Sequence, residues 1–599
     1  METTKYREVW ELDSLFPGGS ESSQLRKHIK ELESKVYTFA NHVSYFKPSQ
    51  EVADSIKIAA LLEHMSTIQI HVSQANSFIT CLLAQNPKDQ TATSLQSKIG
   101  DIRASFDSSV QKTQKILQGI EENLWQSMLD TSLLQNHAFI LNELRTKGAR
   151  QLNDNEFVSE LMIDGYHAWG QFYHALISDI KVNISINGNR NELSVGQAIN
   201  LRSHPDERVR RKSHEVLENT WIDKEDLFAR ILNHIVGFRQ QVYKKRGIEN
   251  VLEEPLIDNR VEEDTLNAMW RAVNKQKKPF VDYLNKKAEL LGEPKLNAYN
   301  FWAPITESTQ QLEYKEAVDF ITKHCGQFGP ELEAFTLNAF EQGWVESENR
   351  SAKSVAAFCA GFPLTGESRV FMTFGGTIKD VLALAHELGH AFHNYAMKSV
   401  DGLSKKYPLS LAETASTFSE MIVLEAAIKE TTSDQEKLFL VDEKLKRSVM
   451  NFMNMHSRFL FEKNLNEERK QGFVPPSRLN ALMKEAMEEA YHSSLENASV
   501  HSWIWTPHYY ITKSPFYNFP YTFGYLFALS IFAKAKEKGK TFEQEYLALL
   551  RDSGRMSTED LVMKHLEEDI KSEVFWEKGL ALCIEDVREF IRLTEKIKR

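Results

Sequence analysis

Residues 386–390, His-Glu-Leu-Gly-His, constrain the fold of this chain more than any other segment. On a helix, side chains four positions apart project from the same face, so the imidazoles of His386 and His390 can reach one metal ion. Glu387 lies beside that face, close enough to contact a metal-bound water without being a ligand. The spacing therefore predicts a helix that carries a zinc site, where Glu387 accepts a proton from the water.

A surface helix with two solvated histidines is the alternative interpretation. The flanking residues disfavour it because they are apolar on nearly every side, which predicts a buried helix. They are Val381, Leu382, Leu384, Ala385, Leu388, Ala391 and Phe392. Buried imidazoles and carboxylates destabilise a fold unless they are paired or bind a metal. Thr377 follows two glycines and precedes Asp380 by three positions, which is the pattern of a capping box at the start of this helix.

A catalytic zinc site needs a third protein ligand, and the candidates lie beyond the motif. A metzincin would have a third histidine at position 396, where this chain has Ala396. Glu413 lies in a segment that indicates a helix start after Pro408, and it would complete a His-His-Glu site. Glu420, two turns further on the same face, either orients a ligand or is a plain structural carboxylate. His393 is expected to pack or hydrogen-bond beside the metal.

Several segments spread over almost the whole chain resemble the oligoendopeptidase F group of the thimet oligopeptidase-like zinc metallopeptidases. The matching segments are 9–17 (VWELDSLFP), 368–376 (SRVFMTFGG), 386–390 (HELGH), 411–416 (LAETAS), 506–510 (TPHYY) and 515–525 (PFYNFPYTFGY). Their order and combination are specific to that group. The resemblance implies one zinc ion per chain, held by His386, His390 and Glu413, with Glu387 as the general base.

The resemblance also implies that an aromatic segment near the C-terminus contacts the peptide and stabilises the transition state. Its candidate residues are His508 and Tyr525 as catalytic groups, with Tyr517 and Tyr521 as substrate-binding groups. A hydroxyl or an imidazole near zinc is the kind of donor that an oxyanion requires. The spacing between His508 and Gly524 departs from the family pattern, which leaves open the tyrosine that fills this role.

Apolar residues recur at helical spacing over most of the chain, which predicts a mainly helical fold. Two such stripes in the first 120 or so residues predict long antiparallel helices packed as a bundle. They run through Leu25, Ile29, Leu32, Val36 and Phe39, and through Leu95, Ile99, Ile102, Phe106 and Val110. Alternating residues on both sides of Asn187-Gly188-Asn189 predict a β-hairpin over residues 182–195.

Residues 370–374 are β-branched and aromatic, which predicts a strand in a small sheet beside the zinc helix. An edge strand there would pair with an extended peptide, so Phe374 and Gly375 are candidate substrate-binding residues. We expect residues 1–195 to form an N-terminal helical part ending in the hairpin, and residues 196–599 to form the catalytic part. The family architecture implies a deep cleft between these parts, which would admit extended peptides and exclude folded proteins.

The expected function is zinc-dependent hydrolysis of internal bonds in short, unstructured peptides. The alternatives are a helical zinc carboxypeptidase, which would need a cationic pocket for the terminal carboxylate, and a peptide-binding protein with a degenerate zinc site, which intact Glu387 disfavours. A net charge of −11 argues against a nucleic-acid partner. Four scattered cysteines, with no signal peptide and no long apolar run, predict a cytoplasmic protein without a membrane partner. The oligomeric state stays open.

Overall fold

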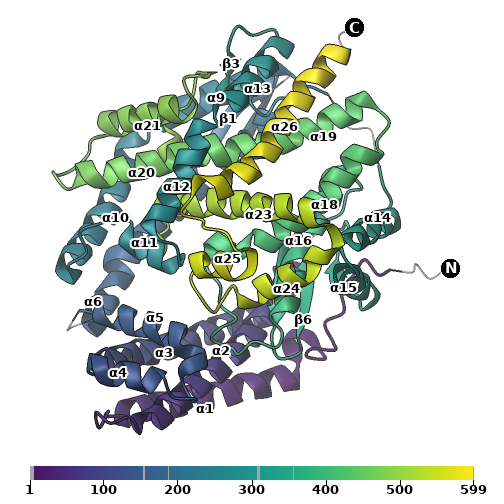
Figure 1. Ribbon diagram of the computed structural model, residues 1–599. Coiled ribbons are helices and arrows are strands. Elements are labelled where there is room, and N and C mark those ends of the chain that lie inside the picture. Colours follow the sequence, from purple (N-terminus) through teal and green to yellow (C-terminus); the bar gives the residue numbers. More distant parts are fainter. Residues whose placement is uncertain are drawn as a thin grey trace. The chain divides into compact units, whose positions relative to one another are not determined.

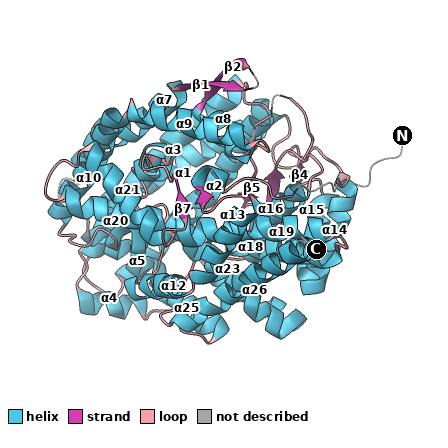
Figure 2. Cartoon of the chain, turned by 90° about the horizontal axis from the view of Figure 1, so that it is seen from above, coloured by secondary structure: helices cyan, strands magenta, loops and turns pink. Residues whose placement is uncertain are grey.

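The computed structural model describes residues 6–152, 155–186, 188–306, 311–351, 353–354 and 356–597, and most of them lie in helices (Figure 1, Figure 2). The mainly helical fold predicted from the apolar spacing is thereby confirmed. The chain divides into two compact units. The first comprises residues 1–151, 310–426 and 534–568, and the second comprises residues 152–309, 427–533 and 569–599. The assignment of the catalytic part to residues 196–599 stays a prediction, because a division into compact units does not show which residues catalyse a reaction.

The first unit combines an N-terminal group of helices with a small sheet and the motif helix. The N-terminal helices are α1 (Ser23–Tyr45), α2 (Asp54–Gln85), α3 (Gln90–Gln118), α4 (Glu122–Leu129) and α5 (Ala138–Ala149). The later elements are α14 (Tyr314–Phe328), α15 (Pro330–Glu341), β4 (Val345–Glu346), β5 (Phe358–Phe362), β6 (Glu367–Phe371), α16 (Ile378–Ala396), α17 (Leu409–Ala412), most of α18 (Thr414–Glu430), α24 (Glu543–Asp552) and α25 (Thr558–Leu566).

The two apolar stripes predicted near the N-terminus lie on α1 and α3 and contribute to one core. All five predicted residues of α1 are buried, while Leu95 and Val110 at the ends of the α3 stripe are partly buried. The same core includes Trp10 of the opening segment, whose ring lies 5.4 Å from that of Phe371 in β6. Burial of apolar side chains, which contributes about 25 cal/mol per Å², therefore joins the N-terminal helices to the sheet.

The small sheet has the strand order β4-β6-β5, so β6 lies in its middle. β6 is parallel to β4 and antiparallel to β5, and Met372 just beyond it donates its N–H to the Glu346 carbonyl at 2.9 Å. The prediction of an edge strand at residues 370–374 is therefore wrong, although a strand does form. An apolar pattern specifies a strand without specifying its neighbours, which come from distant parts of the chain. α16 packs on β5 and β6, which confirms a sheet beside the motif helix.

The second unit is built from helices with a two-stranded hairpin and a second, very short strand pair. Its elements up to residue 306 are α6 (Asn155–Met162), α7 (Ala168–Asp179), β1 (Lys181–Ile186), β2 (Asn189–Ser194), α8 (Val195–Asn200), the 3-10 helix η4 (Leu201–Ser203), α9 (Glu207–Ile222), α10 (Glu225–Arg246), α11 (Glu253–Asp258), α12 (Glu263–Lys275), α13 (Lys278–Leu290) and β3 (Leu296–Asn297). Its later elements are α19 (Asp434–Val449), the π-helical turn η6 (Met450–Asn454), α20 (Met455–Arg469), α21 (Pro476–Ala490), β7 (Leu495–Glu496), α22 (Ser502–Trp505), the 3-10 helix η7 (Pro507–Tyr510), most of α23 (Phe519–Lys538) and α26 (Glu573–Ile597).

Two features of this unit bear on the sequence analysis. β1 and β2 pair antiparallel, which confirms the predicted hairpin, whereas Asn187 of the predicted turn lies outside the described residues. α19, η6 and α20 follow one another without a break as one helical segment. The π turn η6 interrupts the regular spacing, and such turns occur frequently at functional sites.

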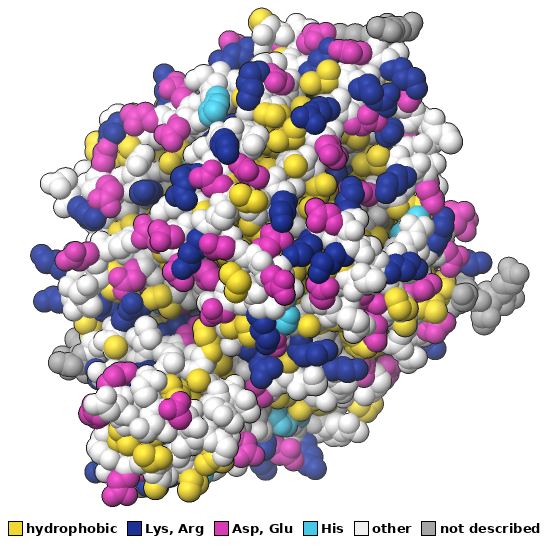
Figure 3. Space-filling view, in the orientation of Figure 1, with side chains coloured by type: hydrophobic (Ala, Val, Ile, Leu, Met, Phe, Trp, Pro, Cys, Tyr) yellow, Lys and Arg dark blue, Asp and Glu magenta, His cyan; other side chains and the backbone are white. Residues whose placement is uncertain are grey.

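The surface is of mixed charge on the face drawn in Figure 3, where Lys and Arg side chains are interspersed with Asp and Glu. That face lacks the extended positive area that a nucleic-acid backbone requires. None of the described helices combines the length and the apolar character needed to cross a bilayer.

Candidate metal site and surrounding residues

The motif histidines lie on α16, which begins where the sequence predicts. Thr377 is its N-cap: the Thr377 hydroxyl accepts from the Asp380 N–H at 3.3 Å, and the Asp380 carboxylate accepts from the Thr377 N–H at 2.9 Å. Most of the apolar residues around the motif are buried. The rings of His386 and His390 lie edge to face with their centroids 5.0 Å apart. The helical spacing thus brings both imidazoles to one side, as predicted.

Glu413 meets both rings from the short break between α17 and α18. Its Oε2 atom lies 3.2 Å from His386 Nε2 and 3.5 Å from His390 Nε2. Ser416, in the first turn of α18, donates its hydroxyl to the same oxygen at 2.8 Å. Within the described part of the chain, these three side chains form a group whose ligand atoms all lie within 4.8 Å of one another and could hold a metal ion.

The close approach of α16 to the segment that carries Glu413 depends on Gly389. A Cβ atom at this position would lie 2.4 Å from the Ala415 carbonyl oxygen and 2.6 Å from the Ser416 Cα atom. Both neighbours are backbone atoms, so a side chain here would push the two segments apart. The position of this glycine inside the motif is the sequence signal from which its role could have been predicted.

Glu420 and His393 flank the ligand group in different ways. The buried Glu420 carboxylate has its Oε2 atom 3.3 Å from His386 Nδ1, so of its two interpretations the geometry favours the ligand-orienting one. His393 is buried as well, with its Nε2 atom 2.9 Å from the Ser553 hydroxyl. Its ring stacks on Tyr407 at a centroid distance of 4.0 Å. His393 therefore packs beside the site, as expected.

Glu387 is buried next to the ligand group, with 8% of its surface exposed. Its Oε2 atom has no hydrogen-bond partner among the described residues. Burial raises the pKa of Glu387 to about 7, against the opposing charge of His386 and with a contribution from the Glu413 charge. A general base is most effective when its pKa lies near the operating pH, so this carboxylate is suited to accept a proton at its unpaired oxygen.

The donor set fits a divalent ion such as zinc. Zinc takes imidazole nitrogen and carboxylate oxygen at about 2.0–2.2 Å in tetrahedral geometry, which separates the ligand atoms by about 3.3 Å. The observed separations of 3.2 Å and 3.5 Å match this geometry. Burial lowers the pKa of His390 to about 4, so its ring is neutral at neutral pH, as a metal ligand must be. Burial opposes ionisation of Glu413, yet its contacts with both imidazoles and with Ser416 hold its pKa at about 2.

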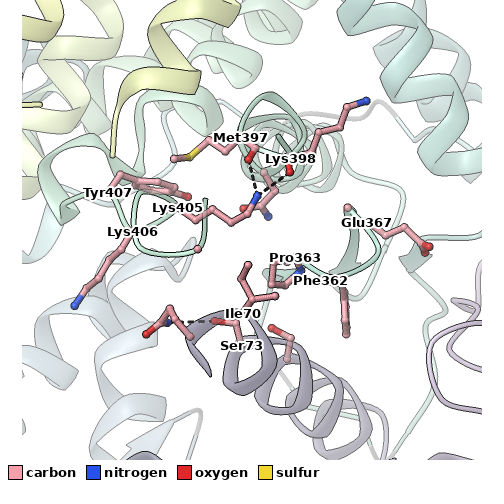
Figure 4. A pocket seen from close by; sticks show the side chains of 16 residues that line it. Ile70, Ser73, Phe362, Pro363, Glu367, Met397, Lys398, Lys405, Lys406 and Tyr407 are labelled. Carbon is pink, nitrogen blue, oxygen red and sulfur yellow. Dashed lines mark hydrogen bonds between the residues drawn. The ribbon is translucent and has the colours of Figure 1, made fainter. Parts of the chain in front are cut away.

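A cavity of about 350 Å³ lies at the C-terminal end of α16 (Figure 4). There the Lys405 ammonium donates to the carbonyl oxygens of Met397 at 2.6 Å and Lys398 at 3.0 Å. These carbonyls belong to the helix end, where intrahelical donors are lacking and a positive charge is favourable. Tyr407, which stacks on His393, also lines this cavity. The loop after α16 therefore anchors the far end of the motif helix.

In the second unit, His508, Tyr517 and Tyr521 form a ring cluster. The His508 ring lies parallel to that of Tyr521 at 5.4 Å and nearly perpendicular to that of Tyr517 at 5.5 Å. The Nη1 atom of Arg458, on α20, lies 3.3 Å from His508 Nδ1. Burial and the Arg458 charge lower the pKa of His508 to about 3. The imidazole is therefore neutral at neutral pH and can donate one hydrogen bond and accept another.

The loop that carries Tyr517 is held by the buried carboxylate of Glu462. Glu462 accepts from the Phe516 N–H at 2.9 Å and from the Asn518 side chain at 2.6 Å. Phe516 has a left-handed backbone with φ of 54°, which is unfavourable for a residue other than glycine, so these bonds stabilise a strained turn. No sequence motif pointed to Glu462.

The remaining predicted residues make internal contacts. Tyr525 is not in the ring cluster: its side chain is buried, and its hydroxyl lies 3.2 Å from that of Ser448. The Phe374 ring is buried as well, and Gly375 donates its N–H to the Asp380 carboxylate at 3.0 Å. The substrate contacts proposed for these residues stay predictions.

Comparisons with known proteins identify the family and the fold. Residues 200–582 match the model of Peptidase family M3, and the chain belongs to that family of metal-dependent peptidases. The oligoendopeptidase F homolog of Lactococcus lactis subsp. lactis is 24% identical over 554 residues, which cover 90% of this chain and 89% of the relative. The chromosomal oligoendopeptidase F of Lactococcus lactis subsp. cremoris is 24% identical over 603 residues, covering 98% and 97%.

Solved structures show the same fold. The crystal structure of oligoendopeptidase-F from Enterococcus faecium aligns with a TM-score of 0.69 at 18% identity, covering 96% of this chain and 99% of that one. A crystal structure from Chlamydophila abortus aligns with a TM-score of 0.83 at 20% identity, covering 99% of both chains. The helical metallopeptidase fold expected from the sequence is thus confirmed.

Proposed function

We propose that this protein is a zinc-dependent oligoendopeptidase, which hydrolyses internal bonds of short, unstructured peptides. The observation that carries the proposal is the convergence of His386, His390 and Glu413 beside Glu387, whose Oε2 atom has no partner in the described structure. A structural zinc site would not need such a base. Relatives described as oligoendopeptidase F support oligopeptides as the substrate class.

The ligand group would hold one zinc ion per chain through His386, His390 and Glu413. When bound, zinc supplies a Lewis acid that lowers the pKa of water and polarises a carbonyl group. Glu387 accepts the water proton at Oε2 and passes it to the nitrogen of the leaving amine. Glu420 keeps the His386 ring turned so that Nε2 faces Glu413.

The ring cluster supplies candidate donors to the peptide and to the oxyanion that forms at the scissile carbon. His508 would donate its N–H, and Tyr517 and Tyr521 would donate their hydroxyls. The catalytic role predicted for Tyr525 has less support, because its hydroxyl bonds to Ser448 in the interior.

Product mapping tests the proposal. One peptide is offered to the zinc-loaded protein in three forms: free, capped at both ends, and displayed as a rigid loop on a folded carrier. Mass spectrometry should find internal cuts in both the free and the capped forms and an intact carrier. Glu387→Gln is the control, because it should keep zinc and fold while losing about 10²–10⁴-fold in kcat.

Release of single C-terminal residues, and only from the free form, would assign a carboxypeptidase instead. Binding of peptide without cleavage by the zinc-loaded protein would assign a peptide-binding protein. A cytoplasmic location stays part of the proposal, since fractionation of cells has to decide it.

A further inference from the structure

The second unit contains a cavity of about 420 Å³ that the proposed mechanism does not use. We call it the arginine cavity, because Arg202 of η4 and Arg458 of α20 line it together with His214, Tyr491 and Trp505. Its wall therefore combines positive charge with aromatic surface. A concave site with a few converging polar groups among rings is typical of ligand pockets.

Neither guanidinium in this cavity is held in an ion pair among the described residues. In the described ranges, no carboxylate forms an ion pair with Arg202 or Arg458. The charge of Glu218 acts on Arg202, but that carboxylate is already bound to His501 at 2.9 Å. Burial and the like charge of Arg458 lower the pKa of Arg202 to about 10. Two neighbouring positive charges in a partly buried site are unfavourable unless an anion compensates them.

The guanidinium of Arg202 is suited to a planar anion. Its guanidinium lies over the Trp505 ring, 4.6 Å from the centroid. An arginine beside an aromatic ring can still offer the edge of its planar guanidinium, with its N–H groups, to a ligand. A carboxylate presents two oxygens in a plane and is bound by such an edge through two parallel hydrogen bonds.

Arg458 connects the arginine cavity to the ring cluster. Its Nη1 atom lies 3.3 Å from His508 Nδ1, while the same side chain lines the cavity. Met450 and Asn454 of the π turn η6 line the cavity too, so an irregular helical turn is built into its wall. An anion held by Arg458 would therefore lie next to residues proposed to contact the peptide. This proximity favours an anionic group of the peptide itself over a free anion.

We propose that the arginine cavity binds a carboxylate group of the peptide substrate, either the C-terminal carboxylate or an Asp or Glu side chain. The inference rests on the proposed function and names the substrate group that this surface recognises. Arg202 presents its edge to the two oxygens, and Arg458 adds a second charge-assisted donor. Holding one carboxylate fixes the register of the peptide and so selects the bond that is cleaved.

The test measures peptide binding in the absence of cleavage. The Glu387→Gln protein is titrated with a fluorescein-labelled peptide in three forms: free acid, C-terminal amide, and free acid with its one internal Glu replaced by Gln. Fluorescence anisotropy gives each Kd. Loss of the recognised carboxylate should raise Kd about 10- to 100-fold, as expected for a hydrogen-bonded charge. Adding Arg202→Gln or Arg458→Gln should raise Kd for the best-bound peptide and remove the difference between forms.

The exposed Arg230→Gln on α10 is the matched control and should leave all three Kd values unchanged. Arg202→Lys keeps the charge without the planar edge, so we expect a Kd between those of the wild-type residue and Arg202→Gln. This variant replaces Arg202→Gln in the test where Arg202→Gln does not fold. Weaker binding of the C-terminal amide would identify the C-terminal carboxylate as the group that the cavity binds. Weaker binding of the Glu-to-Gln peptide would identify an acidic side chain instead.

Equal Kd values for all three forms would overturn the carboxylate proposal even if the wild-type protein cleaves peptides, which would leave the proposed function intact. Absence of cleavage by the zinc-loaded wild type would instead remove the proposed function. The KM values of the wild type for the same peptides provide a second readout and should follow the order of the Kd values.

Discussion

The Nδ1 atom of His386 lies 3.3 Å from Oε2 of Glu420, and this contact determines which ring nitrogen faces Glu413. When Nδ1 donates to the carboxylate, Nε2 is left with its lone pair directed at the ligand group. The ligand geometry therefore depends on a residue that does not itself belong to the group.

Replacing Glu420 with Gln should weaken zinc binding about 10- to 100-fold, because the amide holds the ring without a charge and makes it a poorer donor to the metal. Titration against a competing chelator measures the affinity. Glu430→Gln, an exposed carboxylate on the same helix, is the control. An unchanged zinc affinity in Glu420→Gln would show that the carboxylate is only structural.

Gly389→Ala should loosen the contact between α16 and the segment of Glu413, since the new Cβ atom would lie 2.4 Å from the Ala415 carbonyl oxygen. The expected loss in the free energy of unfolding is about 1–3 kcal/mol, with weaker zinc binding. Gly100→Ala on α3 is the matched control: apart from the nearby backbone of its own helix, no atom lies within 4 Å of its added Cβ, so this variant should be neutral or slightly more stable. Denaturant unfolding and zinc titration of both variants check the contrast, and equal behaviour would contradict it.

Tyr521→Phe and Tyr525→Phe distinguish two of the three candidate tyrosines. Loss of the Tyr521 hydroxyl should reduce kcat about 10²–10³-fold if it donates to the oxyanion. Loss of the Tyr525 hydroxyl, which bonds to Ser448, should leave kcat near the wild-type value and lower stability by about 0.5–1.5 kcal/mol. Steady-state kinetics and thermal unfolding supply both readouts. The reverse pattern would restore the catalytic role predicted for Tyr525.

His501 gives the second unit a pH-dependent contribution to stability. Its Nδ1 atom lies 2.9 Å from Glu218 and its Nε2 atom 3.2 Å from Glu225. Although burial opposes the charge, these carboxylates raise the pKa of His501 above its usual 6.5. The stabilisation is therefore complete below pH 6.5 and is lost as the pH rises through the pKa of the folded protein.

His501→Gln should accordingly lower the free energy of unfolding by about 1.5–3 kcal/mol at pH near 6 and by less at pH near 9. Urea unfolding of the variant and the wild type across this range checks the trend. His174→Gln, an exposed histidine of the same unit, should show no such dependence. A loss that stays constant with pH would mean that His501 contributes by packing alone.

The parts of the site that could be predicted are those set by local spacing. The i, i+4 relation of His386 and His390, and the capping box of α16, follow from helix geometry, and the structure has both. Glu413 could be predicted because a helix start and a family resemblance coincide at that residue. The grouping of Tyr521 with His508 could not be predicted from the sequence, since it depends on how a strained loop is held by the buried Glu462.

The wrong prediction of an edge strand has a related cause. The residues of β6 specify an extended conformation, but β4 and β5 pair with it from separate segments, and no local pattern reports them. The arginine cavity also could not be predicted from the sequence. Its two arginines are far apart in the chain, and only the folded structure brings them to one cavity.

All residues of the candidate metal site lie in the first unit, whereas the ring cluster lies entirely in the second. Metal content consequently reports the integrity of one unit only. A preparation with a damaged second unit would keep all three candidate ligand residues, so a metal assay would not detect the damage. Turnover per bound metal ion is therefore the quantity that reports on both units.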